Sequence, residues 1–210
     1  SIMELTKNVS NDEIEEIIIT ASGGPFLNTS LNKLNYVNPK QAINHPNWKM
    51  GKKISVDSAN LMNKVLEVIE AYKFFKFDVK KYKIMIHPQS YVHSIIRFKN
   101  GLIKMILYNA DMKIPISNIL YGKKNRLLNI SKIKSKVLNK LSFKEVNVKK
   151  FPSIKLIKKC LNSDIYRLFP YSSPKFANHQ VLLEIKESCY NLKTRLLYLQ
   201  KINKSLNSFL

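Results

Sequence analysis

Four polar residues form the strongest candidate for a binding site in this chain of 210 residues: Ser58, Asn63, Lys64 and Glu67. The spacing from Asn63 to Glu67 is four and from Lys64 to Glu67 three, so these side chains share one sector of a helix. Ser58 is expected at the start of that helix, where free N–H groups and the helix dipole attract anions. This arrangement predicts a phosphate site, with Glu67 holding a divalent cation or a proton. The alternative is a capped helix with a surface Lys–Glu pair.

Three further motifs contain residue types suited to ligand binding. Ser22-Gly23-Gly24-Pro25 follows an apolar run, and its glycines would let the backbone approach a ligand or simply form a turn. His45 and Trp48 share a polar loop. Either this loop would close over a site as a lid, or Trp48 would anchor the loop to the core. His87 and His93 lack a third metal-ligand partner nearby, so we expect a structural role for both.

The apolar pattern predicts an α/β arrangement up to residue 122. Two apolar runs are joined by Lys99-Asn100-Gly101, and Asn-Gly is typical of a tight hairpin turn. From residue 151 onward helical periodicity dominates, so we expect an α+β domain with a short sheet and helices, followed by an all-α C-terminal domain. The expected elements are strands at 16–20, 53–56, 82–87, 91–98 and 102–108, and helices at 58–76 and 114–121, with residues 26–52 as loop.

The net charge of +22 comes from 36 Lys and Arg against 14 Asp and Glu. Only four of the basic residues are arginines, whereas proteins that read bases rely on the planar fork of arginine. We therefore interpret the charge as compositional bias and keep nucleic-acid binding as the weaker hypothesis. Residues 123–160 carry 13 basic residues and one acidic residue, which is typical of a solvated linker between domains.

Composition excludes several other classes of protein. Apolar residues make up 45% of the chain, which is enough for a packed core and argues against a disordered polycation. The apolar runs are too short to cross a bilayer, and residues 1–16 contain no signal-peptide pattern. Cys160 and Cys189 are too few for a disulfide framework, so a cytosolic compartment is the simplest expectation.

Taken in order, the motifs resemble 1-deoxy-D-xylulose 5-phosphate reductoisomerase. The resemblance extends over about residues 16–122 and is long and specific. It rests on residues 21–26, 45–59, 62–64, 66–67, 69–71, 86–90, 93–94 and 111–112.

The resemblance implies an NADPH-dependent oxidoreductase and isomerase of the non-mevalonate route to isoprenoids. Such an enzyme converts 1-deoxy-D-xylulose 5-phosphate to 2-C-methyl-D-erythritol 4-phosphate with the help of Mg or Mn. It also implies a homodimer in the bacterial cytoplasm, with a plastid-type organelle as the other location. By this resemblance the phosphate would be bound by Ser22, Ser58, Asn63 and Lys64. His45 and Glu67 would contact the substrate, and Glu67 would also bind the metal. Trp48 and Met50 would form the active-site loop, and Gly51 and Met112 would contact NADPH.

The chain also departs from the family. It contains no GxGxxG-like run for a nucleotide, and the family's Asp-Ser-Glu motif, with two further metal carboxylates, would lie upstream of Ser1. Val65 replaces a glycine in the best-matched helix and is expected to crowd the site.

We therefore expect residues 1–122 to be a portion of the catalytic domain, 123–150 a basic linker and 151–210 a diverged helical domain. The leading hypothesis is an incomplete reductoisomerase that lacks its NADPH-binding domain and is inactive alone. The alternatives are a decayed remnant that dimerises or binds phosphate ligands, and a basic nucleic-acid binder.

Overall fold

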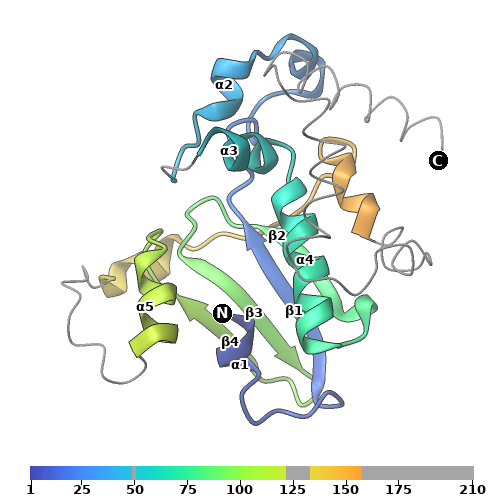
Figure 1. The fold of residues 1–210 in the computed structure, drawn as a ribbon, viewed down its shortest axis with the longest axis vertical. Helices are drawn as coiled ribbons and strands as arrows, with labels where there is room; N and C mark the ends of the chain where they lie inside the picture. The colour runs from blue at the N-terminus through green and yellow to red at the C-terminus, as the bar shows by residue number, and fades with distance from the viewer. Residues whose placement is uncertain (49–50, 122–132, 158–210) are drawn as a thin grey trace.

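The structure, a computed structural model, describes residues 1–48, 51–121 and 133–157. Within these residues the chain forms a mixed five-stranded sheet with strand order β4-β3-β1-β2-β5 (Figure 1). The strands are β1 Ile14–Ala21, β2 Tyr82–Ile86, β3 Val92–Phe98, β4 Ile103–Leu107 and β5 Lys144–Glu145.

The strand directions bring four segments of the chain to one edge of the sheet. β1 and β2 are parallel, β3 is antiparallel to β1, and β4 is antiparallel to β3. The strands β1, β2 and β4 therefore end at the edge where β3 begins. We call this edge the C-terminal edge of the sheet, because the turns after β1 and β2 emerge there.

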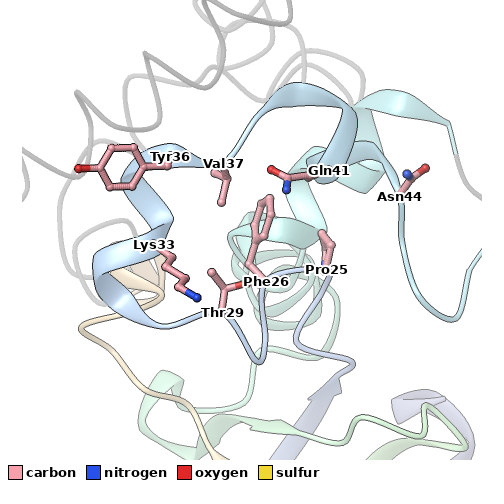
Figure 2. Close-up of a pocket in the computed structure, with 8 residues that line it drawn as sticks. All are labelled: Pro25, Phe26, Thr29, Lys33, Tyr36, Val37, Gln41 and Asn44. Atoms are coloured by element: carbon pink, nitrogen blue, oxygen red, sulfur yellow. The ribbon is translucent and has the colours of Figure 1, made fainter.

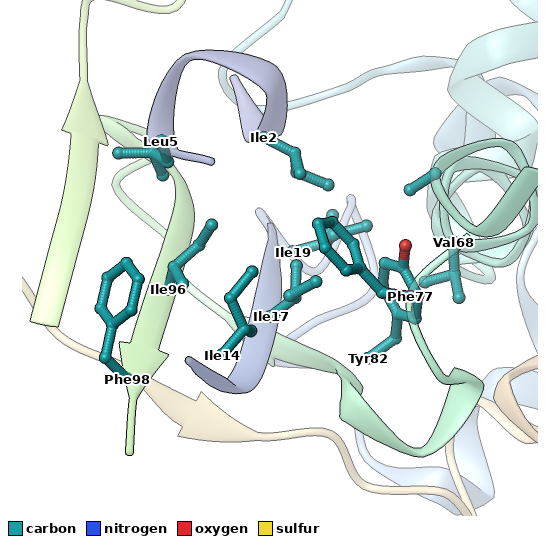
Figure 3. Packing of buried hydrophobic residues seen from close by; sticks show 11 residues of the cluster. Ile2, Leu5, Ile14, Ile17, Ile19, Val68, Phe77, Tyr82, Ile96 and Phe98 are labelled. Carbon is teal, nitrogen blue, oxygen red and sulfur yellow. The ribbon is translucent and has the colours of Figure 1, made fainter. Parts of the chain in front are cut away.

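Two helices cover one face of the sheet. These are α1 Ile2–Leu5, beside β3 and β4, and α4 Met62–Phe75, across β1. Strand β1 alternates, so Ile17 and Ile19 point toward the helices and Ile18 toward the opposite face. The resulting core is shown in Figure 3 and includes Ile2, Leu5, Ile14, Ile17, Ile19, Val68, Phe77, Tyr82, Ile96 and Phe98.

Several predicted elements are confirmed. The β-branched run at 16–20 lies within β1, and residues 82–86 form β2. The two runs joined at 99–101 form the hairpin of β3 and β4, with Gly101 at φ +86°. The helix expected at 114–121 is α5 Lys113–Tyr121.

The prediction of a strand at 53–56 is wrong, because these residues belong to α3 Lys52–Ala59. The run is too short for its period to separate a strand from a helix. Buried Ser55, Val56, Ser58 and Ala59 repeat at helical spacing instead. The single helix expected at 58–76 is also wrong, because the chain breaks at Leu61, which adopts φ +62°, before α4 begins.

Residues 26–52, expected as a loop, contain two short helical segments. These are the 3-10 helix η1 Leu31–Tyr36 and the helix α2 Pro39–Ile43. Asn38 caps α2 in a reciprocal arrangement with Gln41, and Pro39 occupies the first turn. The Asn-Pro pair followed by glutamine is a sequence signal that would have identified this helix.

Part of the basic segment 123–150 is attached to the sheet. After the 3-10 helix η4 Ser135–Lys140, β5 pairs with the end of β2, and Phe151 packs against Ala21, Leu61 and Ile86. The 3-10 helix η5 Pro152–Lys155 follows. The predicted C-terminal helical domain extends beyond residue 157 and so lies largely outside the described residues. In the described part of the chain, no helix is both long and apolar enough to cross a membrane.

Candidate functional site

Ser22 and His45 meet directly at the C-terminal edge of the sheet. Ser22 follows β1, His45 follows α2, and Ser22 Oγ lies 2.9 Å from His45 Nε2. Nδ1 of the same ring accepts the backbone N–H groups of Asn47 and Trp48 at 3.1 and 3.0 Å. Because Nδ1 is an acceptor, the proton of the neutral ring lies on Nε2 and points to Ser22.

The environment of His45 keeps its ring neutral. Burial lowers the pKa of His45, and the positive charge of Lys64 lowers this pKa further. Protonation would also place a hydrogen on Nδ1, where the two backbone donors already point. His45 therefore acts as a fixed hydrogen-bond donor to Ser22 near neutral pH.

The hydroxyl of Ser22 can donate a hydrogen bond to a ligand. Its oxygen accepts from His45 Nε2 and from the backbone N–H of Gly24, at 3.2 Å. A hydroxyl has two acceptor positions and one donor, so both acceptor positions are used. The remaining O–H suits an acceptor-only ligand, such as a phosphate or carboxylate oxygen.

The glycine turn after Ser22 packs against the backbone of Ser58. Gly24 has φ +64°, and a Cβ there would lie 2.5 Å from the carbonyl oxygen of Ser58. Only glycine permits this approach between the turn after β1 and the end of α3. The glycine in this turn is therefore required by packing within the protein.

Ser58 does not begin a helix, so the dipole argument made for it from the sequence is wrong. It is the second-last residue of α3 and is buried. The helix that does begin here is α4, whose Met62 N–H is capped by the side chain of Asn60 at 3.0 Å. Lys64 and Glu67 lie in the first two turns of α4.

Lys64 and Glu67 form a two-pronged ion pair. Lys64 Nζ lies 2.9 Å from each carboxylate oxygen of Glu67. The neighbouring Asn63 has a buried Oδ1 with no hydrogen-bond partner in the structure. Val65, expected to crowd the site, is instead fully buried on the core side of α4 with Leu61 and Val68.

An aromatic cluster lies beside Lys64. The His93 ring stacks on Tyr108 with the ring centroids 3.8 Å apart, and the Trp48 and His93 rings form an edge-to-face pair with centroids 6.2 Å apart. His93 Nε2 lies 3.1 Å from the carbonyl oxygen of Tyr108, so it donates there. Burial is the main cause that lowers the pKa of His93 to about 4, and Lys64 contributes. His93 is therefore neutral at pH 7, and no sequence pattern indicated Tyr108.

Two further residues, which sequence reasoning did not assign to the site, hold its loops. The side chain of Asn47 donates to Pro88 O and Ser90 Oγ at 2.5 and 2.9 Å. His87 is fully buried; its Nε2 accepts the N–H of Tyr91, so its Nδ1 donates to the carbonyl of Ser142 at 2.9 Å. The expectation of a structural histidine is confirmed for His87.

The structure does not gather all candidate residues. Hydrogen bonds link Ser22, His45 and Trp48, and the turn at Gly24 lies against Ser58. Lys64 is paired with Glu67 and is close enough to His45 for its charge to act on that ring. Gly51 precedes α3 with open space at its Cα, and Met112 is 57% exposed ahead of α5. Met50 lies outside the described residues. Gly51 and Met112 leave room for a cofactor, but they do not form a cradle for a dinucleotide.

A cavity of about 580 Å³ lies between the turn after β1 and the segment that contains η1 and α2 (Figure 2). The cavity is bounded by the turn after β1, by η1 and by the end of α2, and Phe26 points into it. None of the ten candidate residues is among its lining residues, which are Pro25, Phe26, Thr29, Lys33, Tyr36, Val37, Gln41 and Asn44.

The described residues do not fit a divalent cation by themselves. They contain no group of three or more His, Cys, Asp or Glu side chains placed to hold a metal. Glu67 is a single carboxylate, and both of its oxygens face an ammonium, whereas Mg²⁺ needs several oxygen ligands. Any cation at Glu67 would require ligands from elsewhere.

Comparison with known proteins agrees with the resemblance seen in the motifs. Residues 1–75 match the family model of the 1-deoxy-D-xylulose 5-phosphate reductoisomerase C-terminal domain. The chain is 46% identical over 164 residues to the reductoisomerase of Pelagibacter ubique (strain HTCC1062), covering 78% of this chain and 42% of that protein. It is 42% identical over 208 residues to the enzyme of Wolbachia pipientis wMel, covering 96% and 51%. The chain is related to the 1-deoxy-D-xylulose 5-phosphate reductoisomerases.

Solved structures of reductoisomerases share the fold. One was determined with NADPH, fosmidomycin and magnesium; it superposes with a TM-score of 0.66 at 37% identity and covers 71% of this chain and 37% of that one. The Zymomonas mobilis reductoisomerase with NADPH gives a TM-score of 0.65 at 36% identity, covering 72% and 39%. The chain spans about half or less of the length of the reductoisomerases it matches.

Proposed function

We propose that residues 1–210 form the substrate-binding part of a 1-deoxy-D-xylulose 5-phosphate reductoisomerase, which makes 2-C-methyl-D-erythritol 4-phosphate with NADPH in isoprenoid biosynthesis. The observation that carries this proposal is the group formed by Ser22, His45 and Lys64 at the C-terminal edge of the sheet. It offers the hydroxyl proton of Ser22 and, close enough to act on His45, the ammonium of Lys64. A phosphate ester is the kind of ligand that needs such donors.

The resemblance to the reductoisomerases assigns a role to each residue. Ser22 and Lys64 would donate to phosphate oxygens, and Ser58 and Asn63 would complete the grip beside them. His45 would orient Ser22, and Glu67 would face the hydroxyl end of the substrate. Trp48 and Met50 would cover the substrate and exclude water. Gly51 would approach NADPH, and Met112 would pack near its nicotinamide.

The cofactors would supply what the side chains of this chain cannot. NADPH would deliver a hydride, and Mg²⁺ or Mn²⁺ would polarise the substrate oxygens. The described residues contribute at most Glu67 to a metal and contain no dinucleotide cradle. Further metal ligands and a nucleotide-binding part would therefore have to come from outside the described residues. Ser1 Oγ lies 3.0 Å from the hydroxyl of Tyr108, so a segment joined ahead of Ser1 would start beside the aromatic cluster.

The wider organisation belongs to the same proposal. Residues 1–122 would be a catalytic portion, 123–150 a basic connection that pairs with the sheet at β5, and 151–210 a helical domain. A homodimer would use the sheet face opposite α4, where Ile103 and Met105 of β4 are 52% and 42% exposed. Light scattering of Met105→Asp beside the unchanged protein tests this surface. The bacterial relatives support a location in the cytoplasm.

The function is tested by reconstitution and by ligand protection. We expect residues 1–210 to be stabilised against heat by 1-deoxy-D-xylulose 5-phosphate, and this protection to be lost in Lys64→Ala but kept in Lys73→Ala on the same helix. We expect NADPH oxidation only when the N-terminal half of a relative is added.

Two results would favour the alternatives. A complete lack of protection, with no activity on reconstitution, would indicate a decayed remnant. Retention on DNA that falls steeply with salt would indicate a nucleic-acid binder.

A further inference from the structure

The ion pair between Lys64 and Glu67 uses the same ammonium that the proposed function assigns to phosphate. Nζ lies 2.9 Å from both carboxylate oxygens, and the Lys64 side chain is 18% exposed while that of Glu67 is 42% exposed. The ammonium is therefore partly enclosed, and it contacts both oxygens of the more exposed Glu67 carboxylate. An incoming anion has to share Lys64 with this carboxylate or take it.

We propose that Lys64 is exchanged between Glu67 and phosphate: Glu67 holds the ammonium while the site is empty and releases it when a phosphate group binds. The proposal rests on the assignment of Lys64 to phosphate in the proposed function. A pair at i and i+3 on a helix surface contributes little to stability, so it is easily given up. Phosphate offers charge-assisted hydrogen bonds with a larger negative charge than one carboxylate.

The surroundings of Lys64 favour this exchange. The charge of Lys64 lowers the pKa of both His45 and His93, and both rings are neutral. Neither histidine therefore offers a second positive charge to an incoming anion. Ser22 keeps a hydroxyl proton for the same anion. Phosphate would therefore be held by Lys64 and by neutral donors, with Glu67 as the competing acceptor.

The exchange explains why Glu67 pairs with Lys64 in the structure although the family resemblance implies that it binds a metal. The family resemblance assigns Glu67 to a metal, but in the described residues an ammonium already occupies both of its oxygens. Glu67 would become free of this internal counter-ion only after an anion has drawn Lys64 away. The anion would thus prepare Glu67 for a second positive charge.

The test measures inorganic phosphate binding in buffer with EDTA, so that metals do not contribute. Amide chemical shifts of the full 210-residue chain give the dissociation constant for four single variants and the unchanged protein. If breaking the pair costs roughly 0.5–1 kcal/mol, Glu67→Gln should bind phosphate about two- to fivefold more tightly. Glu70→Gln removes the same charge from an exposed position on α4 and should leave the affinity unchanged.

The remaining variants separate exchange from simple repulsion. Lys64→Met should lose most phosphate binding, and Lys73→Met should not. In the Lys64→Met background, Glu67→Gln should have no further effect, because there is no ammonium left to release. An equal gain in that background would mean long-range repulsion and would overturn the exchange.

The outcomes distinguish the exchange from the proposed function. If Lys64→Met abolishes binding but Glu67→Gln binds no more tightly than the unchanged chain, only the exchange is wrong. If the unchanged chain binds no phosphate, or Lys64→Met binds as well as it does, the phosphate role of Lys64 fails and the exchange fails with it.

Discussion

Replacing Gly24 by alanine should separate the two halves of the candidate phosphate site. The new Cβ would lie 2.5 Å from the carbonyl oxygen of Ser58 and 3.0 Å from Cα of Ala59, and both are backbone atoms. The turn after β1 and the end of α3 must therefore move apart by several tenths of an ångström or more. Ser22, two residues before Gly24, would move with the turn and away from Ser58.

The size of the effect can be separated into two parts. Placing alanine at φ +64° costs roughly 1–2 kcal/mol in backbone strain alone. The collision with Ser58 adds a cost comparable to overpacking a core, which is about 1–3 kcal/mol. Gly101→Ala is the matched control, because Gly101 has φ +86° but nothing lies within 4 Å of its Cβ position.

Urea denaturation and phosphate titration would measure the two consequences. We expect Gly24→Ala to lower the free energy of unfolding by about 1–3 kcal/mol more than Gly101→Ala does. Phosphate binding should weaken in Gly24→Ala and stay unchanged in Gly101→Ala. Equal destabilisation by the two variants, with phosphate binding intact in both, would refute the packing role of Gly24.

Three further predictions concern the histidines and the loops. The pKa of His93 in the folded protein lies near 4, below its ordinary value of 6.5. The neutral His93 ring therefore stabilises the fold above pH 6.5, and this contribution, at most about 3 kcal/mol, is lost as the pH falls toward 4. His93→Gln should make the free energy of unfolding depend less on pH between 6.5 and 4. Asn47→Ala should speed amide exchange in residues 44–48, because its bonds to Pro88 and Ser90 are lost, while the midpoint of global unfolding changes little. His87→Phe leaves the N–H of Tyr91 and the carbonyl of Ser142 without partners, so it should lower the free energy of unfolding in urea by about 2–4 kcal/mol. A loss below about 1 kcal/mol would contradict the structural role of His87.

Local patterns predicted those parts of the fold that depend on neighbouring residues. The β-branched run of β1 and the Asn-Gly turn of the hairpin are decided by a few adjacent side chains. The spacing of Lys64 and Glu67 likewise predicted their contact, because both lie on one helix.

The errors and omissions have a common physical cause. At the break, Leu61 is buried against Ala21, Ile86 and Phe151, which lie far away in the sequence, so no local pattern records it. The tautomer of His45 is set by backbone donors two and three residues later, and the roles of Asn47 and His87 depend on residues 41 to 55 positions away. Contacts at 41 to 55 residues depend on the complete fold, so local patterns in one sequence do not reveal them.

The hydrogen bond from His87 to Ser142 joins the loop after β2 to a segment that contributes none of the candidate residues. Through Pro88 and Ser90 that loop holds Asn47, which in turn adjoins His45. A shortened form of the protein that stops before residue 133 would keep every candidate residue but lose the hydrogen bond between His87 and Ser142. A shortened piece for recombinant expression or crystal trials of the site should therefore extend past Ser142.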